Sequence, residues 1–303
     1  MKMWDLVTSQ FSFTALWSPV FLAGTVVAAL LYLAVVGPLR SRFTHAVPVP
    51  WYKKMSFVAG LFAFYLGFGG PVYLIGHLMF SAHMFKMAFV YFITPPLLMF
   101  GTPAWLVRPL FRYRAVEKLF KIVMHPFPSL FMFNLLVSLY HIPQLFDHLM
   151  ANYTLHIGYQ AVLFVTALFM WWQVLTPLPE FDRLSDIKKI AYVFANSALL
   201  LPACALIIFA DHTIYATYTD PAKWATALGY CLPAGTTVPP QLFETFSLLS
   251  PMEDQQLGGI VMKLTQETVF MIVLGHIFYH WVKKEKKVVD IQDFQRYPRL
   301  SNK

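Results

Sequence analysis

The sequence predicts an all-α, polytopic membrane protein with seven transmembrane helices, its N-terminus outside and its C-terminus in the cytoplasm. Of its 303 residues, 58% are hydrophobic and only 13% are charged, whereas a soluble domain carries about 25% charged residues. Aromatic residues make up 17% of the chain, which is typical of lipid-facing surfaces and interfacial belts. The charge deficit and a series of long apolar runs therefore indicate lipid as the solvent.

Seven segments are long and apolar enough to cross a bilayer, which takes about 20 residues in a helix. No repeat or low-complexity linker divides them, so we expect a single domain over residues 1–303. The boundary between the second and third segments falls among Gly69, Gly70, Pro71 and His77. The expected spans are residues 18–37, 55–75, 78–100, 127–146, 156–175, 190–210 and 257–282.

The orientation follows from the basic residues of the loops. The first, third and fifth loops and the C-terminal tail, residues 283–303, hold 19 of the 23 Lys and Arg residues. The opposite side holds only Lys2 and Lys223, while Lys86 and Lys263 fall within spans. Positive charge accumulates on the cytoplasmic side, so this alternation predicts the N-out, C-in topology. We expect the acidic, Pro-rich outer loop, about residues 211–256, to cover the outer mouth of the bundle.

Several function classes are excluded by composition and motif. The net charge of +8 is scattered between apolar stretches, which argues against a nucleic-acid partner. Cys204 and Cys231 are too few for a disulfide framework or a thiolate-rich metal site. No Gly-rich phosphate loop, nucleophile elbow or His-Glu-x-x-His motif is present, so we do not expect an enzyme.

The histidines give the most informative pattern. Ionisable groups inside spans are costly and usually face the interior of the bundle. Imidazole and thioether groups are ligands that suit Cu(I), and imidazole also suits Cu(II) and Zn(II). Six of the ten histidines are expected at or near the outer ends of spans three to six: His77, His83, His141, His148, His156 and His212.

Span three offers sulfur ligands beside these imidazoles. Met79, His83 and Met87 are spaced i, i+4, i+8, so one helical face would carry all three. His77 and Met84 are seven residues apart and would share another face. The sequence thus predicts a copper site on the outer half of span three.

Further ligands could come from neighbouring segments. Met252 and Asp254 lie just before span seven. His141 precedes a proline at 143 that should end span four, and His148 follows seven residues later. Asp147 could orient a neighbouring imidazole as a hydrogen-bond acceptor.

Each of these residues also has a structural interpretation. A methionine can fill the core, and a histidine can anchor a helix at the membrane interface. His276 and His280, near the cytoplasmic end of span seven, have a spacing that can chelate a metal, but an aromatic–polar belt is the favoured interpretation. Lys263 and Glu267 are i, i+4, and pairing would lower the cost of burying both charges.

Six sequence blocks, in order, resemble the cytochrome c oxidase assembly factor CtaG family. They cover most of the chain, from about residue 70 to residue 282. The blocks are SAHM at 81–84, TPPLL at 94–98, GTP at 101–103, HIP at 141–143 with His156, WW at 171–172 and DQQLGG at 254–259.

The resemblance implies a factor in a bacterial plasma membrane that helps to assemble a caa3-type oxidase, with a proposed role in supplying copper to the catalytic subunit. His83, His141, His156 and Asp254 match family positions. Many members have a second histidine four residues after the first, where this chain has Met87, preceded by Lys86. A lysine beside a cationic metal would repel it unless it points away or is neutralised.

The leading hypothesis is therefore a non-catalytic assembly factor that binds copper transiently, with Cu(I) favoured and an oxidase subunit as partner. Three rivals stay open. A haem-binding redox protein would use two histidines as axial ligands. A retinal-type receptor would use Lys263 in the last span. A metal-free escort of the oxidase subunit would need the histidines only as interfacial anchors.

Overall fold

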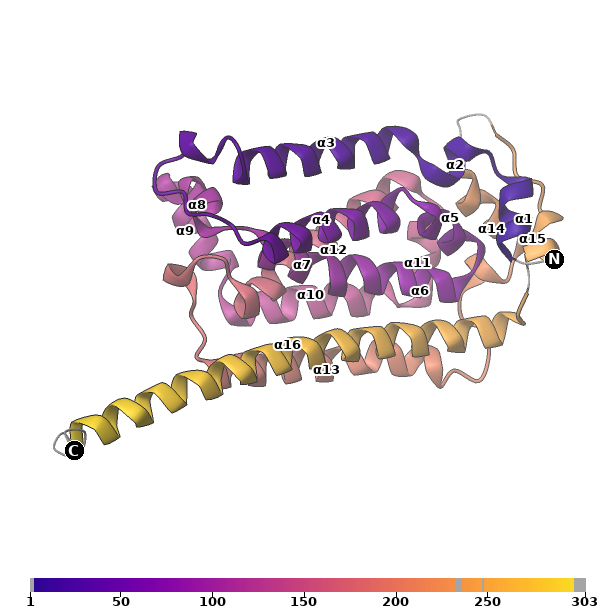
Figure 1. Cartoon of the computed structure of the whole chain (residues 1–303). Helices are drawn as coiled ribbons and strands as arrows, with labels where there is room; N and C mark the ends of the chain where they lie inside the picture. The colour runs from indigo at the N-terminus through magenta and orange to yellow at the C-terminus, as the bar shows by residue number, and fades with distance from the viewer. Residues whose placement is uncertain (1–2, 233–235, 247, 297–303) are drawn as a thin grey trace.

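The computed structural model describes residues 3–232, 236–246 and 248–296. Every regular element in these residues is a helix. The long helices lie side by side, and the two ends of the chain lie at opposite ends of the bundle (Figure 1). An odd number of crossings produces this arrangement, as the sequence predicts. We call the end that carries the loop of residues 211–256 the outer end, in line with the predicted topology.

Seven membrane crossings are present if one bent helix pair counts as a span, which agrees with the predicted fold class. Six crossings are formed by helices, some of them kinked, that are long and apolar enough. The seventh is the pair α10 and α11, which is bent by 79°. The spans are Phe13–Val36, Trp51–Leu78, Phe80–Gly101, the pair Pro126–Tyr140 and Pro143–Met150, Tyr153–Leu175, Asp186–Ile208 and Pro251–Lys286.

The first span lies at the edge of the bundle (Figure 1), where Tyr32 stacks on Phe57 and donates to the Gly101 carbonyl. Two short helices, α1 (Met3–Gln10) and α2 (Phe13–Trp17), precede α3 (Pro19–Val36) at the outer end. Only 11% of the most apolar window of this span is buried. Such exposure would be costly in water, but lipid tails cover an apolar helix without penalty.

Spans two and three meet at a single non-helical residue, Met79. Span two consists of α4 (Trp51–Phe68) and α5 (Pro71–Leu78). Gly69 and Gly70 kink it without ending it, because both of their N–H groups bond to the Tyr65 carbonyl. Met79 has extended backbone geometry. The expected end of span two at residue 75 is therefore extended by three residues.

Span three contains a π-helical turn that Pro95 explains. It consists of α6 (Phe80–Ala88), the π-helix η2 (Phe89–Ile93) and α7 (Thr94–Gly101). Pro95 has no N–H group to donate to the carbonyl four residues earlier, on Tyr91. The indole N–H of Trp171, on α12 (Tyr153–Leu175), donates to that carbonyl at 2.9 Å. A bond between helices thus replaces the one that the proline removes.

The first helix of span four ends earlier than the sequence predicts. Helix α10 (Pro126–Tyr140) stops at Tyr140, and α11 (Pro143–Met150) turns away from it. Pro143 is the first residue of α11, a position where its missing N–H costs nothing. The expected single helix over residues 127–146 is thus replaced by a bent pair, while the predicted break at the proline is confirmed.

The last two spans, α13 (Asp186–Ile208) and α16 (Pro251–Arg296), lie side by side (Figure 1). The predicted ion pair is present on α16: Lys263 Nζ lies 2.5 Å from Glu267 Oε1. Ser197 of α13 bonds to the same carboxylate. Helix α16 is longer than the expected 257–282, and part of the predicted cytoplasmic tail continues it to Arg296. Residues 297–303 of that tail, and the side chains of residues 287–296, lie outside the described part.

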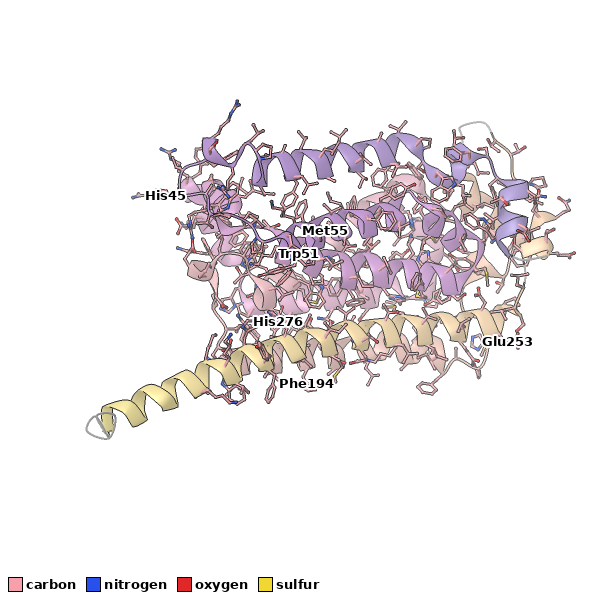
Figure 2. The ribbon with its side chains drawn as sticks, in the orientation of Figure 1. His45, Trp51, Met55, Phe194, Glu253 and His276 are labelled. Carbon is pink, nitrogen blue, oxygen red and sulfur yellow. The ribbon has the colours of Figure 1, made fainter. Side chains whose placement is uncertain are left out.

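The loops contain short helices. The outer loop is structured by η5 (Ala216–Tyr218), α14 (Pro221–Gly229) and α15 (Leu242–Phe246). Glu253 marks the outer end in Figure 2, and His45 lies at the opposite end. The loops at that opposite end carry η1 (Arg40–Arg42), α8 (Ala104–Val107), η3 (Arg108–Arg112), α9 (Arg114–Val123) and η4 (Pro179–Phe181).

The variant Trp171→Phe tests the hydrogen bond from the Trp171 indole to the Tyr91 carbonyl, which replaces the helical bond that Pro95 cannot make. Removal of the indole N–H leaves the buried Tyr91 carbonyl without a partner, which costs about 1–3 kcal/mol. The neighbouring Trp172→Phe is the matched control, because the Trp172 Nε1 is buried and has no partner. We expect a lower melting temperature in detergent for Trp171→Phe than for Trp172→Phe. Equal melting temperatures would contradict this account of the π-turn.

Candidate metal site at the outer end of the bundle

Four of the predicted histidines come together inside the outer end of the bundle. His77 lies on α5, His83 on α6, His141 directly after α10, and His156 in the first turn of α12. Their exposed fractions are 2%, 0%, 0% and 3%. The site is thus enclosed by protein, not open on the surface.

In this histidine cluster, His77, His83, His141 and His156, the last three rings lie around Tyr140, and His77 lies beside His156. The ring centroids of His77 and His156 are 5.9 Å apart, and those of His83 and His156 are 6.4 Å apart. Tyr140 lies 6.0 Å from His83 and 5.6 Å from His141. Two imidazoles that bind one ion at about 2 Å from each nitrogen have centroids about 5–6 Å apart. The two histidine pairs are at or slightly beyond this separation.

Two of the imidazoles are oriented by backbone carbonyls. His77 Nδ1 bonds to the Tyr73 carbonyl at 3.0 Å, and His141 Nδ1 bonds to the Val137 carbonyl at 2.7 Å. A carbonyl accepts only, so Nδ1 carries the proton in both rings and Nε2 presents its lone pair. Metal-binding histidines are typically held in this way.

Three imidazole nitrogens of the cluster are buried without a hydrogen-bond partner in the described part of the chain: His83 Nδ1, His141 Nε2 and His156 Nδ1. The other nitrogen of His83 bonds to the Tyr140 hydroxyl at 3.1 Å, and that of His156 bonds to the Gln160 amide at 2.8 Å. Buried polar atoms are nearly always paired, and an unpaired one commonly marks a place for water or an ion.

Met87 lies one helical turn after His83 on α6. His83 and Met87 are both helical and buried, as their i, i+4 spacing predicts. Met79 lies in the turn before the helix, so it does not share that helical face. The prediction that His77 and Met84 share a helical face is also wrong, because the turn at Met79 puts these residues on different helices.

Lys86 adds a positive charge beside the cluster. It is 1% exposed, and its Nζ has no hydrogen-bond partner among the described residues. The nitrogen lies 5.1 Å from the centre of the Tyr73 ring. Its charge acts on His77, His83 and His156, so a protonated Lys86 opposes a cation bound at these imidazoles.

Two of the predicted histidines lie outside the cluster. His148, on α11, is exposed. His212 is also exposed and pairs with its neighbour Asp211, 2.5 Å away. Within the described residues, no three His, Cys, Asp or Glu side chains converge closely enough to hold a metal ion between them.

The Asp254 side chain caps the N-terminus of α6. Its carboxylate accepts hydrogen bonds from the backbone N–H groups of Phe80, at 2.6 Å, and Ser81, at 3.1 Å, and from the Ser81 hydroxyl. Helix N-termini carry unpaired N–H groups and favour a negative charge. Asp254 therefore ties α16 to the helix that carries His83.

Gly258 permits this close approach of α16 to α6. A Cβ atom at this position would lie 2.6 Å from the Phe80 ring. Small residues commonly let membrane helices pack backbone to backbone. The DQQLGG block thus combines a helix cap with a close-packing residue.

The outer loop covers the histidine cluster at the outer end of the bundle. Tyr215 donates to the His141 carbonyl at 2.9 Å, Tyr218 to the Gly76 carbonyl at 2.6 Å, and Trp224 to the Leu78 carbonyl at 3.2 Å. Burial raises the pKa of the Tyr215 and Tyr218 phenols, so both remain donors at neutral pH. The predicted cover of the outer mouth is thus part of the site.

Asp147 anchors that loop and does not orient a histidine. Its carboxylate accepts from the N–H groups of Ala216 and Thr217, at 3.0 and 2.8 Å, and from the Thr217 hydroxyl at 2.7 Å. Tyr140, Gln160 and the loop aromatics were missed by sequence reasoning. Only the position of Tyr140, next to His141, could have suggested its role.

The comparisons with known proteins agree with this architecture. No curated protein and no solved structure matches the chain significantly. The profile of one family, the cytochrome c oxidase caa3 assembly factor (Caa3_CtaG), matches residues 30–284, which include the end of the first span, all of the next five and nearly all of the last. The chain therefore belongs to the caa3 cytochrome c oxidase assembly factor family.

Proposed function

We propose that this assembly factor carries copper in its histidine cluster and helps to insert it into the catalytic subunit of the oxidase. The observation that carries the proposal is the set of three unpaired, buried imidazole nitrogens around Tyr140. Such nitrogens cost free energy when they have no partner. A bound metal ion would satisfy the lone pairs of His83 Nδ1 and His141 Nε2, whereas His156 Nδ1 carries the proton because its Nε2 accepts from the Gln160 amide. Copper is here a cargo that enters and leaves the protein.

The ligand set favours Cu(I). His77 Nε2, His83 Nδ1 and His141 Nε2 offer few lone pairs, and Met87, one helical turn after His83, would add a soft thioether. A site of low coordination number, with the charge of Lys86 close by, would hold the ion weakly enough to release it. His148 and Asp254 are left out of the proposed ligand set, because the first is exposed and the second caps α6.

The proposed setting is the bacterial plasma membrane, with the catalytic oxidase subunit as partner. The cluster lies at the predicted outer end of the spans, and we propose that the copper site of the oxidase receives the ion at this level of the membrane. Copper transfer between two membrane-embedded sites at the same depth requires no catalytic group, so we propose a non-enzymatic role.

The packing around His83 disfavours the haem alternative. The imidazole has four aromatic rings within 6.5 Å, those of Phe80, Tyr140, Phe146 and Tyr218. A porphyrin whose iron is bound by the His83 imidazole would displace several of these aromatic rings. The metal-free escort remains the alternative that a copper measurement separates from our proposal.

Copper loading of the purified protein tests the proposal. Wild type reconstituted with Cu(I) should retain about one copper per chain, and the double variant His83→Ala/His141→Ala should retain none, because each change removes an unpaired imidazole. The control is His148→Ala, which lies on the same end of the bundle but is exposed. Copper retained by the double variant, or absent from wild type, would favour the escort.

Asp254→Asn separates a structural carboxylate from a ligand. One oxygen becomes an NH2 group that faces a backbone N–H, so we expect a loss of about 1–2 kcal/mol in stability. The copper content of the folded protein should stay that of wild type. Glu253→Gln, next in the chain and exposed, is the control. A variant of normal melting temperature that no longer binds copper would make Asp254 a ligand.

A further inference from the structure

A basic cavity lies at the end of the bundle opposite the histidine cluster. Its volume is about 1050 Å3, and it lies between the start of α4, the end of α7 and the last turns of α16 that belong to the span. Its charged and titratable lining comprises His45, Lys53, Arg108, Lys189, His276, His280, Lys284 and one carboxylate, Asp186.

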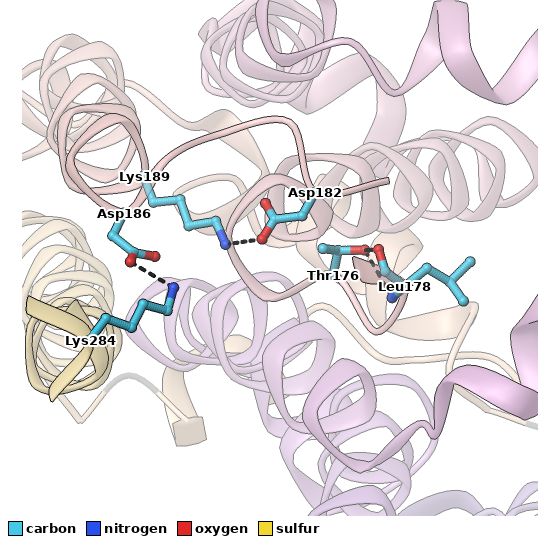
Figure 3. Close-up of polar contacts among 6 residues, drawn as sticks. All are labelled: Thr176, Leu178, Asp182, Asp186, Lys189 and Lys284. Atoms are coloured by element: carbon cyan, nitrogen blue, oxygen red, sulfur yellow. Dashed lines mark hydrogen bonds and ion pairs between the residues drawn. The ribbon is translucent and has the colours of Figure 1, made fainter. Parts of the chain in front are cut away.

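Most of these cations already have carboxylate partners. Lys189 bonds to Asp182 at 2.7 Å and Lys284 to Asp186 at 2.8 Å (Figure 3). Arg108 pairs with Glu180 at 2.7 Å and lowers the pKa of that carboxyl by hydrogen bonding.

Lys53 differs from the other three cations. No described carboxylate lies within ion-pair distance of it, and its Nζ lies 5.5 Å from the Phe100 ring. It is half-buried beside His276, on which its charge acts. The cavity therefore contains one positive charge, on Lys53, that has no carboxylate partner among the described residues.

Two further groups point to a ligand with hydrogen-bond acceptors. His276 and His280 have ring centroids 4.4 Å apart and line the cavity together. Trp105, which is 6% exposed, also lines it, and its indole N–H is buried with no partner among the described residues. This indole nitrogen is itself closed off from the cavity, whereas Lys53, His276 and His280 can donate to an anion with several oxygens.

An apolar groove of about 570 Å3 continues from this cavity along the side of the bundle. Both share Phe100, Leu175 and His276 (Figure 2 labels His276). Leu264 and Ile272 line the groove and are 62% and 67% exposed. The groove is therefore open to the lipid side, and it extends from the basic cavity towards the middle of the membrane.

We propose that the cavity and the groove together bind one anionic phospholipid, with its phosphate beside Lys53 and the imidazoles of His276 and His280, and an acyl chain between α7 and α16. Basic pockets between membrane helices on the cytoplasmic side bind anionic headgroups. A free phosphate ion would satisfy the same donors, but it would leave the groove unused. This site is separate from the proposed copper cluster, at the other end of the bundle.

Lipid retention by the full chain tests this proposal. The protein is purified from nanodiscs that contain phosphatidylglycerol and phosphatidylcholine in equal amounts, and the retained lipids are counted by native mass spectrometry. Wild type should keep one phosphatidylglycerol in preference to phosphatidylcholine. Lys53→Gln should lower that preference about fivefold, since one basic residue contributes about 1 kcal/mol. Lys54→Gln, the adjacent lysine outside the cavity lining, should behave as wild type.

A groove variant distinguishes a lipid from a phosphate ion. Thr268→Trp fills the groove without changing the basic cavity, and we expect it to abolish retention of the lipid. Equal retention of the two lipids by wild type, or equal losses in Lys53→Gln and Lys54→Gln, would overturn the proposal. It would also be overturned if inorganic phosphate displaced all retained phosphatidylglycerol and Thr268→Trp bound as wild type does.

Discussion

The contact between the Asp254 carboxylate and the first N–H groups of α6 holds the functional end of this protein together. It joins residues 174 positions apart in the chain and fixes the last span against the helix that carries His83. A helix that begins inside a membrane bundle has no water to satisfy its free N–H groups. The carboxylate supplies that partner, and Gly258 allows the two helices to come close enough for it to do so.

The same constraint makes the histidine cluster conspicuous. Some polar groups inside the bundle find partners on a neighbouring helix: Trp171 bonds to the Tyr91 carbonyl, and Asn134 bonds to Asn196 at 2.8 Å. Single buried atoms without a partner, such as Trp172 Nε1 and Gln266 Oε1, are scattered through the rest of the described bundle. Around Tyr140, by contrast, three imidazole nitrogens remain without partners. A low-dielectric interior makes such unpaired groups costly. The copper binding that we propose would explain why they are placed there, and the outer loop explains how they are kept from water.

Much of the fold could be predicted from the sequence, because the apolar runs and loop charges determine the crossings and their order. The turn at Met79 could not, since Gly69, Gly70 and Pro71 are stronger breaking signals, yet their N–H groups bond in a way that keeps span two helical. The gathering of histidines at one end was expected, but their pairing around Tyr140 depends on how distant helices pack. The hydrogen-bond partners of Asp254 could not be predicted either, because no local sequence pattern links residue 254 to residue 80.

The copper content of the oxidase itself tests whether the histidine cluster supplies this copper, as we propose. Cells that produce His83→Ala in place of the wild-type factor would be compared with cells that produce His148→Ala. Both variants should insert into the membrane at wild-type levels. We expect the oxidase from the His83→Ala cells to contain markedly less copper, and that from the His148→Ala cells to be fully loaded. A fully loaded oxidase in both would contradict the account and leave the histidine cluster a structural feature only.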